Sequence, residues 1–465
     1  MDITTLKKKT IKKLRAWLDS REIGAEELCA EYLKRIKASN PELQALITVT
    51  KEEAKAGAKA AQARINKKEA AALTGIPAVI NDNILTSGIV TTCASKMLEN
   101  FIPPYDAGVI EQLKKSDYVL LGKANMDEFS VGCSPKSGDA MGASLALYSI
   151  GSDTGGAVSL SAAFHGMTGL RPTYGRVSRY GLAAFAGSLD QIGPIAKTAE
   201  DCAMILNEIA GRDARDATCI GRGSKEDFTA KAGAGVKGLK IAVPKEFFGE
   251  EIAEEKRTAV MNAAKELEKQ GAALIECSVG MVEYAVAVYY IVSSAEASSN
   301  LSRYDGVNFG LRGEGKTYFE QIVNSRDRGF GDEVKRRIML GNFVLAHDNY
   351  AEYFQKALAL RQKIRAEYDE ILKTADIILT PTVPDIILGD FNGGSYGKEF
   401  MADIFTAPPA LAGLPSVTTT CGYKKTGLPI GVSLTGRRLD EQTVIGAADC
   451  FERIFKPELF EEAAI

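Results

Sequence analysis

Short β-rich runs alternate with helical stretches along most of this chain, and this alternation constrains the fold more than any other feature. The β-rich runs are Pro77–Ile80, Tyr118–Leu121, Leu239–Val243, Ala273–Cys277, Ile377–Leu379, Val417–Thr420 and Ile430–Leu434. The helical stretches, identified by apolar spacing, are 25–38, 51–67, 106–115, 199–211, 255–270, 333–372 and 440–455. Such alternation predicts α/β layers, with helices on both faces of a sheet.

The chain has 465 residues, a length that suggests two or three domains, although α/β enzymes often run this long as one unit. Segments rich in glycine and small residues at 230–238, 310–315 and 389–397 are typical of loops, and none resembles a long disordered linker. We therefore predict a single domain over residues 1–465. The region 205–330 is a candidate cap or insert on the main sheet.

Composition excludes several classes of function. A net charge of −3 gives no electrostatic argument for nucleic-acid binding by this chain alone. The eight cysteines include no C-x-x-C pair, so neither a zinc nor a redox site is predicted, and we expect no metal. The two histidines, His165 and His347, do not lie near another recognisable catalytic element, which disfavours a histidine-dependent triad.

The N-terminal sequence MDITTLKKKTIKKLRAWL is too charged for the apolar core of a signal peptide. We expect a solvated helix whose buried side carries Leu6, Ile11, Leu14 and Leu18, rather than a basic helix lying on a membrane. The chain has no run of 18 apolar residues, so no membrane span is predicted. The expected location is the cytoplasm.

The stretch from Gly151 to Gly169, GSDTGGAVSLSAAFHGMTG, resembles the amidase-signature family. In that family the residue after Thr-Gly-Gly is the nucleophilic serine, whereas this chain has Ala157, which has no oxygen. The likeness continues, with its blocks in the family's order, through residues 73–131, 168–196, 293–310, 333–361 and 403–435. The segments TTCASKMLENF and YGRVSRYGL favour the branch formed by the A subunits of glutamyl-tRNA(Gln) amidotransferases.

The resemblance implies a mixed central sheet covered by helices. It also implies that the chain hydrolyses glutamine and that the B subunit uses the released ammonia to amidate glutamate on a mischarged tRNA. The C subunit would hold the other two together. ATP and magnesium would belong to the B subunit, so we expect no cofactor in this chain and only indirect contact with tRNA.

The catalytic positions of the family are all changed. The family's lysine follows a G-I-P-x-x-x motif, and here that position is Asn81, whose amide has no useful basicity. The relay serine lies in a Gly-Gly-Ser-Ser-Gly-Gly loop that this chain lacks, because the sequence is shortened around residues 132–150. The third position is Ala157. Three losses together predict that hydrolysis is abolished or severely impaired.

Parts of the binding pocket are retained, by resemblance. The turn Thr154, Gly155 and Gly156 matches the family's oxyanion hole, although the glycines also suit any strand-to-helix turn. Arg361 matches the arginine that holds the glutamine α-carboxylate, with a surface ion pair as the alternative. Asp403 matches the acid that pairs with the α-ammonium, and it is equally suited to cap a helix. Phe309 replaces a tyrosine, so one hydrogen bond to the substrate is expected to be lost.

Two residues are candidates for rescue of the lost catalysis. In a helix that begins near Gly156, Ser161 would face almost the same side as Ala157 but lie about 6 Å further along the axis. Near-attack geometry tolerates little displacement, so this rescue is disfavoured. Lys123 could replace the missing base, but it occupies a different family position and is expected to pair locally.

Three hypotheses follow from these residues. The first is a pseudoenzyme that keeps the fold, and with it the contacts to the B and C subunits. The second is an active glutaminase with displaced catalytic residues, such as Ser161 with Lys123. The third is a sensor that binds glutamine or another amide through Arg361, Asp403 and the glycine turn.

Overall fold

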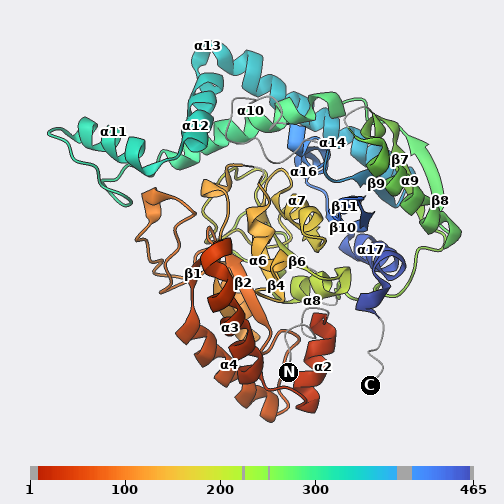
Figure 1. Cartoon of the computed structure of the whole chain (residues 1–465). Helices are drawn as coiled ribbons and strands as arrows, with labels where there is room; N and C mark the ends of the chain where they lie inside the picture. The colour runs from red at the N-terminus through yellow and green to blue at the C-terminus, as the bar shows by residue number, and fades with distance from the viewer. Residues whose placement is uncertain (1–8, 133, 222–225, 250–251, 385–400, 461–465) are drawn as a thin grey trace.

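The fold is built on one large sheet. The computed structural model describes residues 9–132, 134–221, 226–249, 252–384 and 401–460 (Figure 1). Within these residues the strands are β1 (Leu46–Val49), β2 (Pro77–Asn81), β3 (Val119–Ala124), β4 (Tyr148–Asp153), β5 (Thr168–Arg171), β6 (Gln191–Ala196), β7 (Lys240–Pro244), β8 (Ala273–Cys277), β9 (Ile377–Pro381), β10 (Ser416–Tyr423) and β11 (Pro429–Gly436). These eleven described strands form one sheet in the order β1-β3-β2-β4-β6-β5-β10-β11-β9-β7-β8.

The sheet is mixed, which confirms the α/β prediction. Strand β2 runs parallel to β3 and β4, and β7 runs parallel to β8 and β9. The other pairs are antiparallel, including β4 with β6 and β10 with β11. All seven predicted β-rich runs overlap strands of this sheet, although two of them begin one residue before the strand, at Tyr118 and Leu239. Parallel β2 and β4 bring the ends of both strands to the same edge, where the candidate site lies.

Helices cover the sheet. The described α-helices are α2 (Ile11–Ser20), α3 (Ala25–Leu43), α4 (Lys51–Asn66), α5 (Gly108–Lys115), α6 (Asp139–Gly142), α7 (Ala157–Phe164), α8 (Ala199–Ile209), α9 (Glu254–Lys269), α10 (Val282–Leu301), α11 (Tyr318–Gly329), α12 (Asp332–Leu345), α13 (His347–Asn349), α14 (Lys356–Thr374), α16 (Ala407–Ala412) and α17 (Glu441–Phe455). In Figure 1, α3 and α4 lie beside β1 and β2, while α10, α12 and α14 lie together on the opposite side of the molecule. Helix α11 projects from that layer.

The hydrophobic core has two main parts. One surrounds the strands and contains Ile80, Leu121 and Ile150, all fully buried. The other lies under the α10, α14 and α16 layer and contains Tyr289 and Leu411. The glycine turn after β4 lies where the second part meets the sheet, because Tyr289 contacts this turn directly.

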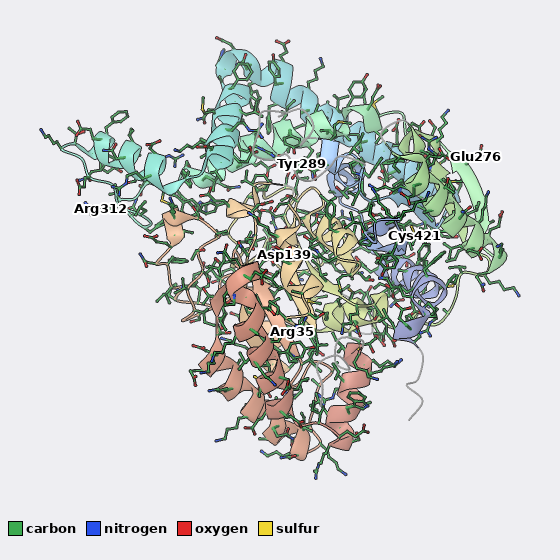
Figure 2. The ribbon with its side chains drawn as sticks, in the orientation of Figure 1. Arg35, Asp139, Glu276, Tyr289, Arg312 and Cys421 are labelled. Carbon is green, nitrogen blue, oxygen red and sulfur yellow. The ribbon has the colours of Figure 1, made fainter. Side chains whose placement is uncertain are left out.

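The region predicted as an insert and the shortened region both contain regular structure. The region 205–330, predicted as a cap or insert, contributes β7 and β8 to the main sheet, together with α9, α10 and α11. The division into domains stays a prediction. The shortened region 132–150 contains a 3-10 turn (Pro135–Gly138), α6 and the start of β4. Arg35 of α3 braces this region by donating to the carbonyl of Ala143 at 2.9 Å, and Figure 2 labels both Arg35 and Asp139 of α6.

The N-terminal helix matches its prediction, whereas one long helix does not. Ile11, Leu14 and Leu18 of α2 are buried as expected, and Leu6 lies outside the described residues. The stretch 333–372 was predicted as one continuous helix, which is wrong. Ala346 has an extended backbone (ψ 143°) that ends α12, and a π-helical segment at Tyr350–Gln355 precedes α14.

Candidate functional site

A tight turn joins β4 to α7 and forms the centre of the candidate site. Gly156 has φ +134°, a conformation that side-chain-bearing residues rarely adopt, and Ala157 is the first residue of α7. Among the residues that the structure describes, the backbone N–H groups of Gly155 and Gly156 donate to no protein atom. They are therefore available to a carbonyl oxygen, as an oxyanion hole requires.

Asp153 fixes the start of α7 from the end of β4. Its Oδ2 accepts a hydrogen bond from the backbone N–H of Val158 at 2.9 Å, which satisfies one free donor of the helix N-terminus. Its other oxygen pairs with Arg171, which also donates to the Asp153 carbonyl at 2.7 Å and to the Leu189 carbonyl at 2.8 Å. The side chains of Asp153 and Arg171 are 0% and 2% exposed, so this ion pair lies in the interior.

The turn is covered by side chains from distant parts of the chain. The hydroxyls of Thr154 and Tyr289 are 3.1 Å apart, and Figure 2 labels Tyr289 on α10. A Cβ atom added at Gly155 would lie 2.4 Å from Cζ of Tyr289. At Gly156 it would lie 2.2 Å from Oγ1 of Thr406. Both glycines are therefore needed for packing, independently of any chemistry.

Asn81, at the family's lysine position, ends β2 and is 1% exposed. Its Nδ2 lies 3.1 Å from where a Cβ would stand on Gly151, so the amide packs against β4. Beside it, Asn83 donates to Ser130 at 2.8 Å and to Ser152 at 2.7 Å, and the two serine hydroxyls lie 3.1 Å apart. This polar group at the ends of β2 and β4 is part of the site that the sequence analysis missed.

Lys123 is enclosed in β3 and is fully buried. Its ammonium donates to the Ile84 carbonyl, to Thr86 at 3.1 Å and to Thr91 at 3.3 Å. Burial lowers the pKa of Lys123 to about 8, and the opposing charge of Asp82 limits the drop. The lysine thus binds locally, as expected, and its three described acceptors lie in the segment that follows β2.

Ser161 lies one turn into α7 and is buried against the shortened region. Its Cβ lies 3.0 Å from where a Cβ would stand on Gly138, in the 3-10 turn 135–138. The Ser161 carbonyl accepts from Nδ1 of His165 at 2.8 Å, and Nε2 of the same ring lies 3.1 Å from Asp139. Ser161 is therefore part of the packing that closes the shortened region over α7, and no described contact joins it to Lys123.

Asp403 belongs to the same buried neighbourhood as the turn. It is 4% exposed, and its Oδ2 accepts from the Tyr290 hydroxyl at 3.4 Å. Burial raises the pKa of the Asp403 carboxyl to about 7; Arg337 opposes the rise and Asp153 adds to it. Arg337 is itself buried, pairs with Glu333 at 2.8 Å and lies over the Tyr290 ring. The acid and its buried cation thus lie beside the Asp153 end of the turn.

Replacing Asp403 with asparagine is expected to stabilise the chain increasingly as pH rises. The unfolded carboxyl titrates near 3.8, whereas the folded one keeps its proton up to about pH 7. Between these values the unfolded chain releases a proton that the folded chain retains, so the parent loses stability as pH rises. Asparagine does not titrate.

Thermal melts across this range test the expectation. The difference in melting temperature between the variant and the parent should grow from about pH 4 to about pH 7 and then level off. Asp348→Asn, at a carboxyl that is 97% exposed, is the control and should show no such trend. A difference for Asp403→Asn that does not change with pH would contradict the assignment.

Arg361 lies at the edge of this neighbourhood, because it binds Ser188, the residue before the Leu189 whose carbonyl accepts from Arg171, whereas no described contact joins Phe309 to it. Arg361 donates to the Leu411 carbonyl at 3.0 Å, to the Ser188 hydroxyl at 2.7 Å and to the Ser188 carbonyl at 2.8 Å. Phe309 is 42% exposed, and its ring contacts Tyr304. The structure therefore places Asn81, the turn and Asp403 in one buried region with Arg361 at its edge, while Phe309 lies elsewhere, and the roles of these residues stay predictions.

Comparison with known proteins identifies the family of this chain. The sequence profile of the Amidase family matches residues 27–138 and 134–445. The chain belongs to the amidase family. It is 43% identical over 475 residues to the A subunit of glutamyl-tRNA(Gln) amidotransferase from Thermoanaerobacter pseudethanolicus, covering 96% of each chain. The same subunit of Ruminiclostridium cellulolyticum is 44% identical, with 98% of each chain covered.

Solved structures agree. The crystal structure of the glutamyl-tRNA(Gln) amidotransferase A subunit from Thermotoga maritima matches with a TM-score of 0.75 and 37% identity, covering 92% of this chain and 91% of that one. A bacterial aryl acylamidase matches with a TM-score of 0.81 at 21% identity, which shows the fold alone. The chain thus shares both the sequence and the fold of the amidase family.

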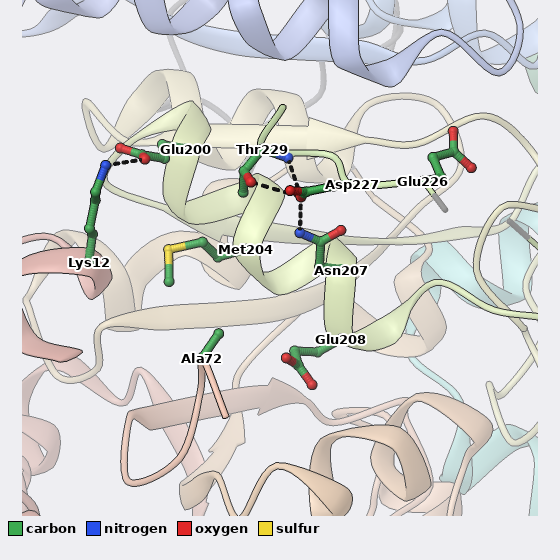
Figure 3. Close-up of a pocket in the computed structure, with 9 residues that line it drawn as sticks. All are labelled: Lys12, Ala72, Glu200, Met204, Asn207, Glu208, Glu226, Asp227 and Thr229. Carbon is green, nitrogen blue, oxygen red and sulfur yellow. Dashed lines mark hydrogen bonds and ion pairs between the residues drawn. The ribbon is translucent and has the colours of Figure 1, made fainter. Parts of the chain in front are cut away.

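One cavity of this chain lies between α2 and α8, away from the glycine turn, and has a volume of about 460 Å³ (Figure 3). Its acids are held by neighbours: Glu200 pairs with Lys12 at 2.6 Å, and Asp227 accepts from Asn207 at 2.7 Å. Within the described ranges, no three histidine, cysteine or acidic residues are placed to hold a metal ion. None of the helices described is long and apolar enough to cross a membrane.

Proposed function

We propose that this chain takes the place of the A subunit in a glutamyl-tRNA(Gln) amidotransferase without hydrolysing glutamine at a useful rate. One observation carries the proposal: the first residue of α7 after the glycine turn is Ala157, so the turn presents a methyl group where the family has its nucleophile. Asn81 at the lysine position supports it, because an amide cannot take a proton from a hydroxyl at neutral pH. The similarity to A subunits supports the assembly.

The contacts of Ser161 and Lys123 also support inactivity. Ser161 packs against Gly138 and His165, while Lys123 donates to Ile84, Thr86 and Thr91. An activated nucleophile needs its base within hydrogen-bond reach. Displaced catalysis by these two residues would therefore require both side chains to leave buried surroundings.

The proposal extends to partners. The B and C subunits would bind this chain, ATP and magnesium would act on the B subunit, and tRNA would be contacted only through that partner. The chain itself would need no cofactor. We place the complex in the cytoplasm, because its tRNA substrate is charged there.

Glutamate release from glutamine tests the proposal. The purified chain, mixed with the B and C subunits, is expected to release no glutamate above background, whereas the Thermotoga maritima A subunit serves as the positive control. The double variant Asn81→Lys/Ala157→Ser is also expected to be silent, because the relay serine loop is missing. Activity in the double variant would show that only two side chains had ended the chemistry.

Two outcomes would overturn the proposal. Glutamate release by the parent chain that Ser161→Ala abolishes would establish a rewired amidase. Failure of the chain to co-elute with the B and C subunits in gel filtration would refute the proposal that it assembles with them.

A glutamine sensor is the second candidate. It is favoured by the unused N–H groups of Gly155 and Gly156 beside the buried Asp403. Calorimetry with glutamine decides between the two: binding that Asp403→Ala weakens would support the sensor, and no heat at millimolar glutamine would remove it.

A further inference from the structure

A second cavity is lined by three arginines. It lies at the C-terminal end of α16, whereas Asp403 precedes the start of that helix. Its volume is about 470 Å³, and its walls come from α14, from the end of α16 and from the loop before α17. Arg361 and Arg365 project from α14, and Arg438 projects from the loop. None of the described residues that line it is acidic. Residues 153–157, at the glycine turn, do not line it either.

Two of the three guanidinium groups of this cavity, those of Arg361 and Arg438, form no ion pair within the described residues. Arg438 makes no hydrogen bond or ion pair within the part of the chain that the structure describes. Arg365 reaches Asp369 only at 3.6 Å, and both of these side chains are about half exposed, so the pair holds it weakly. Arg361 donates to neutral oxygens of Ser188 and Leu411.

The neighbouring charges show the same imbalance. Burial lowers the pKa of Arg361 and of Arg438, and the positive charge of Arg365 contributes to both decreases. The acid nearest to Arg438 on α17, Glu441, is already committed to Arg176 at 2.8 Å and to the N–H of Thr173 at 3.0 Å. The cavity is therefore a concave surface on which arginines predominate, and the acids that act on them from outside the lining, Glu296 and Asp369, offset only part of their charge.

The remaining lining decides the class of ligand. Leu358, Leu411 and Ala412 are apolar, and the ring of Tyr174 adds a flat hydrophobic wall. Guanidinium groups bind carboxylates and phosphates through paired hydrogen bonds. From the arrangement of cationic and apolar walls, we infer that this cavity binds a small organic molecule that carries two or more carboxylate or phosphate groups, with Arg365 and Arg438 as its ion-pairing side chains.

This site goes beyond the proposed function, because it needs neither glutamine nor the glycine turn. Glutamine has a single carboxylate, whereas a di- or tricarboxylate offers a separate anionic group to each of the two arginines. The apolar side chains of the lining can also pack against the carbon skeleton of an organic ligand, and inorganic phosphate has no such skeleton.

Isothermal titration calorimetry on the full chain tests the inference, with citrate as the organic probe and inorganic phosphate as the mineral one. Citrate is expected to bind one-to-one, at least about ten-fold more tightly than phosphate. The double variant Arg365→Gln/Arg438→Gln should lose about 100-fold in citrate affinity, about ten-fold for each charged hydrogen-bonding partner removed. Both side chains are exposed, so the variant is expected to fold.

The matched control is Lys363→Gln, on α14 but outside the cavity lining, which should bind citrate as the parent does. Three results would overturn the inference: no heat with citrate, an equal loss in the control and the double variant, or phosphate binding as tight as citrate. Millimolar glutamine should not displace citrate; if it does, the cavity is part of a glutamine site instead.

Discussion

Replacing Arg171 with methionine is expected to destabilise the chain by about 3–5 kcal/mol, because it leaves the buried carboxylate of Asp153 without its counter-charge. The two side chains are 2% and 0% exposed, so water cannot take the place of the guanidinium. Arg171 also satisfies the backbone carbonyls of Asp153 and Leu189. Urea unfolding followed by circular dichroism measures the loss.

Two further variants separate charge from packing. Adding Asp153→Asn to Arg171→Met should return part of the lost stability, because the orphaned charge is removed while the hydrogen bond to Val158 can remain. Lys373→Met removes an ion pair whose partners are 69% and 70% exposed, and it should leave the urea midpoint unchanged. An Arg171→Met midpoint equal to that of the parent would contradict the role of the buried pair.

The sequence analysis missed β1, β4, β5 and β6, and β4 and β6 show why local propensity alone cannot identify every strand. β6 reads QIGPIA and β4 reads YSIGSD, and glycine, serine and proline disfavour strands locally. Both are central strands paired on two sides, with register Ile150↔Pro194 between them. Their pairing is a tertiary effect that a local pattern cannot show.

The helical errors have a similar origin. α10 is apolar around most of its surface, with Val288, Tyr289 and Val292 all buried, so it lacks the amphipathic period that reveals a helix. The break at Ala346 has neither glycine nor proline to mark it. Both features depend on packing between α10, α12 and α14, which lie side by side only in the folded chain.

The resemblance assigned roles to Asn81, Ala157 and Asp403, and these roles stay predictions, whereas the surroundings of these residues could not be predicted. The residues that cover the turn, Tyr289 and Thr406, come from more than 100 positions away in the chain and carry no motif. Long-range packing of this kind is absent from a one-dimensional pattern, and so is the commitment of Arg361 to Ser188.

Replacing Gly156 with alanine is expected to be as disruptive as losing the buried ion pair, at roughly 2–6 kcal/mol. A side chain at φ +134° strains the backbone by about 1–3 kcal/mol. The added Cβ would also lie 2.2 Å from Oγ1 and 2.3 Å from Cβ of Thr406, an overlap that costs about another 1–3 kcal/mol. Gly88→Ala is the control for a glycine in open space, because nothing lies within 4 Å there and only backbone strain applies, which is smaller at φ +77° than at +134°.

The second variant of this series isolates the packing contribution. Adding Thr406→Gly to Gly156→Ala removes the overlapping atoms, so the urea midpoint should recover relative to Gly156→Ala alone while the backbone strain remains. Equal destabilisation by Gly156→Ala and Gly88→Ala would instead mean that Thr406 moves aside at no cost. If the overlap is confirmed, Gly156 is required by its backbone conformation and by the contact between the turn and Thr406 at the start of α16. The persistence of the Thr-Gly-Gly turn then needs no surviving catalysis to explain it, and the case for or against activity rests on Asn81, Ala157 and the shortened region.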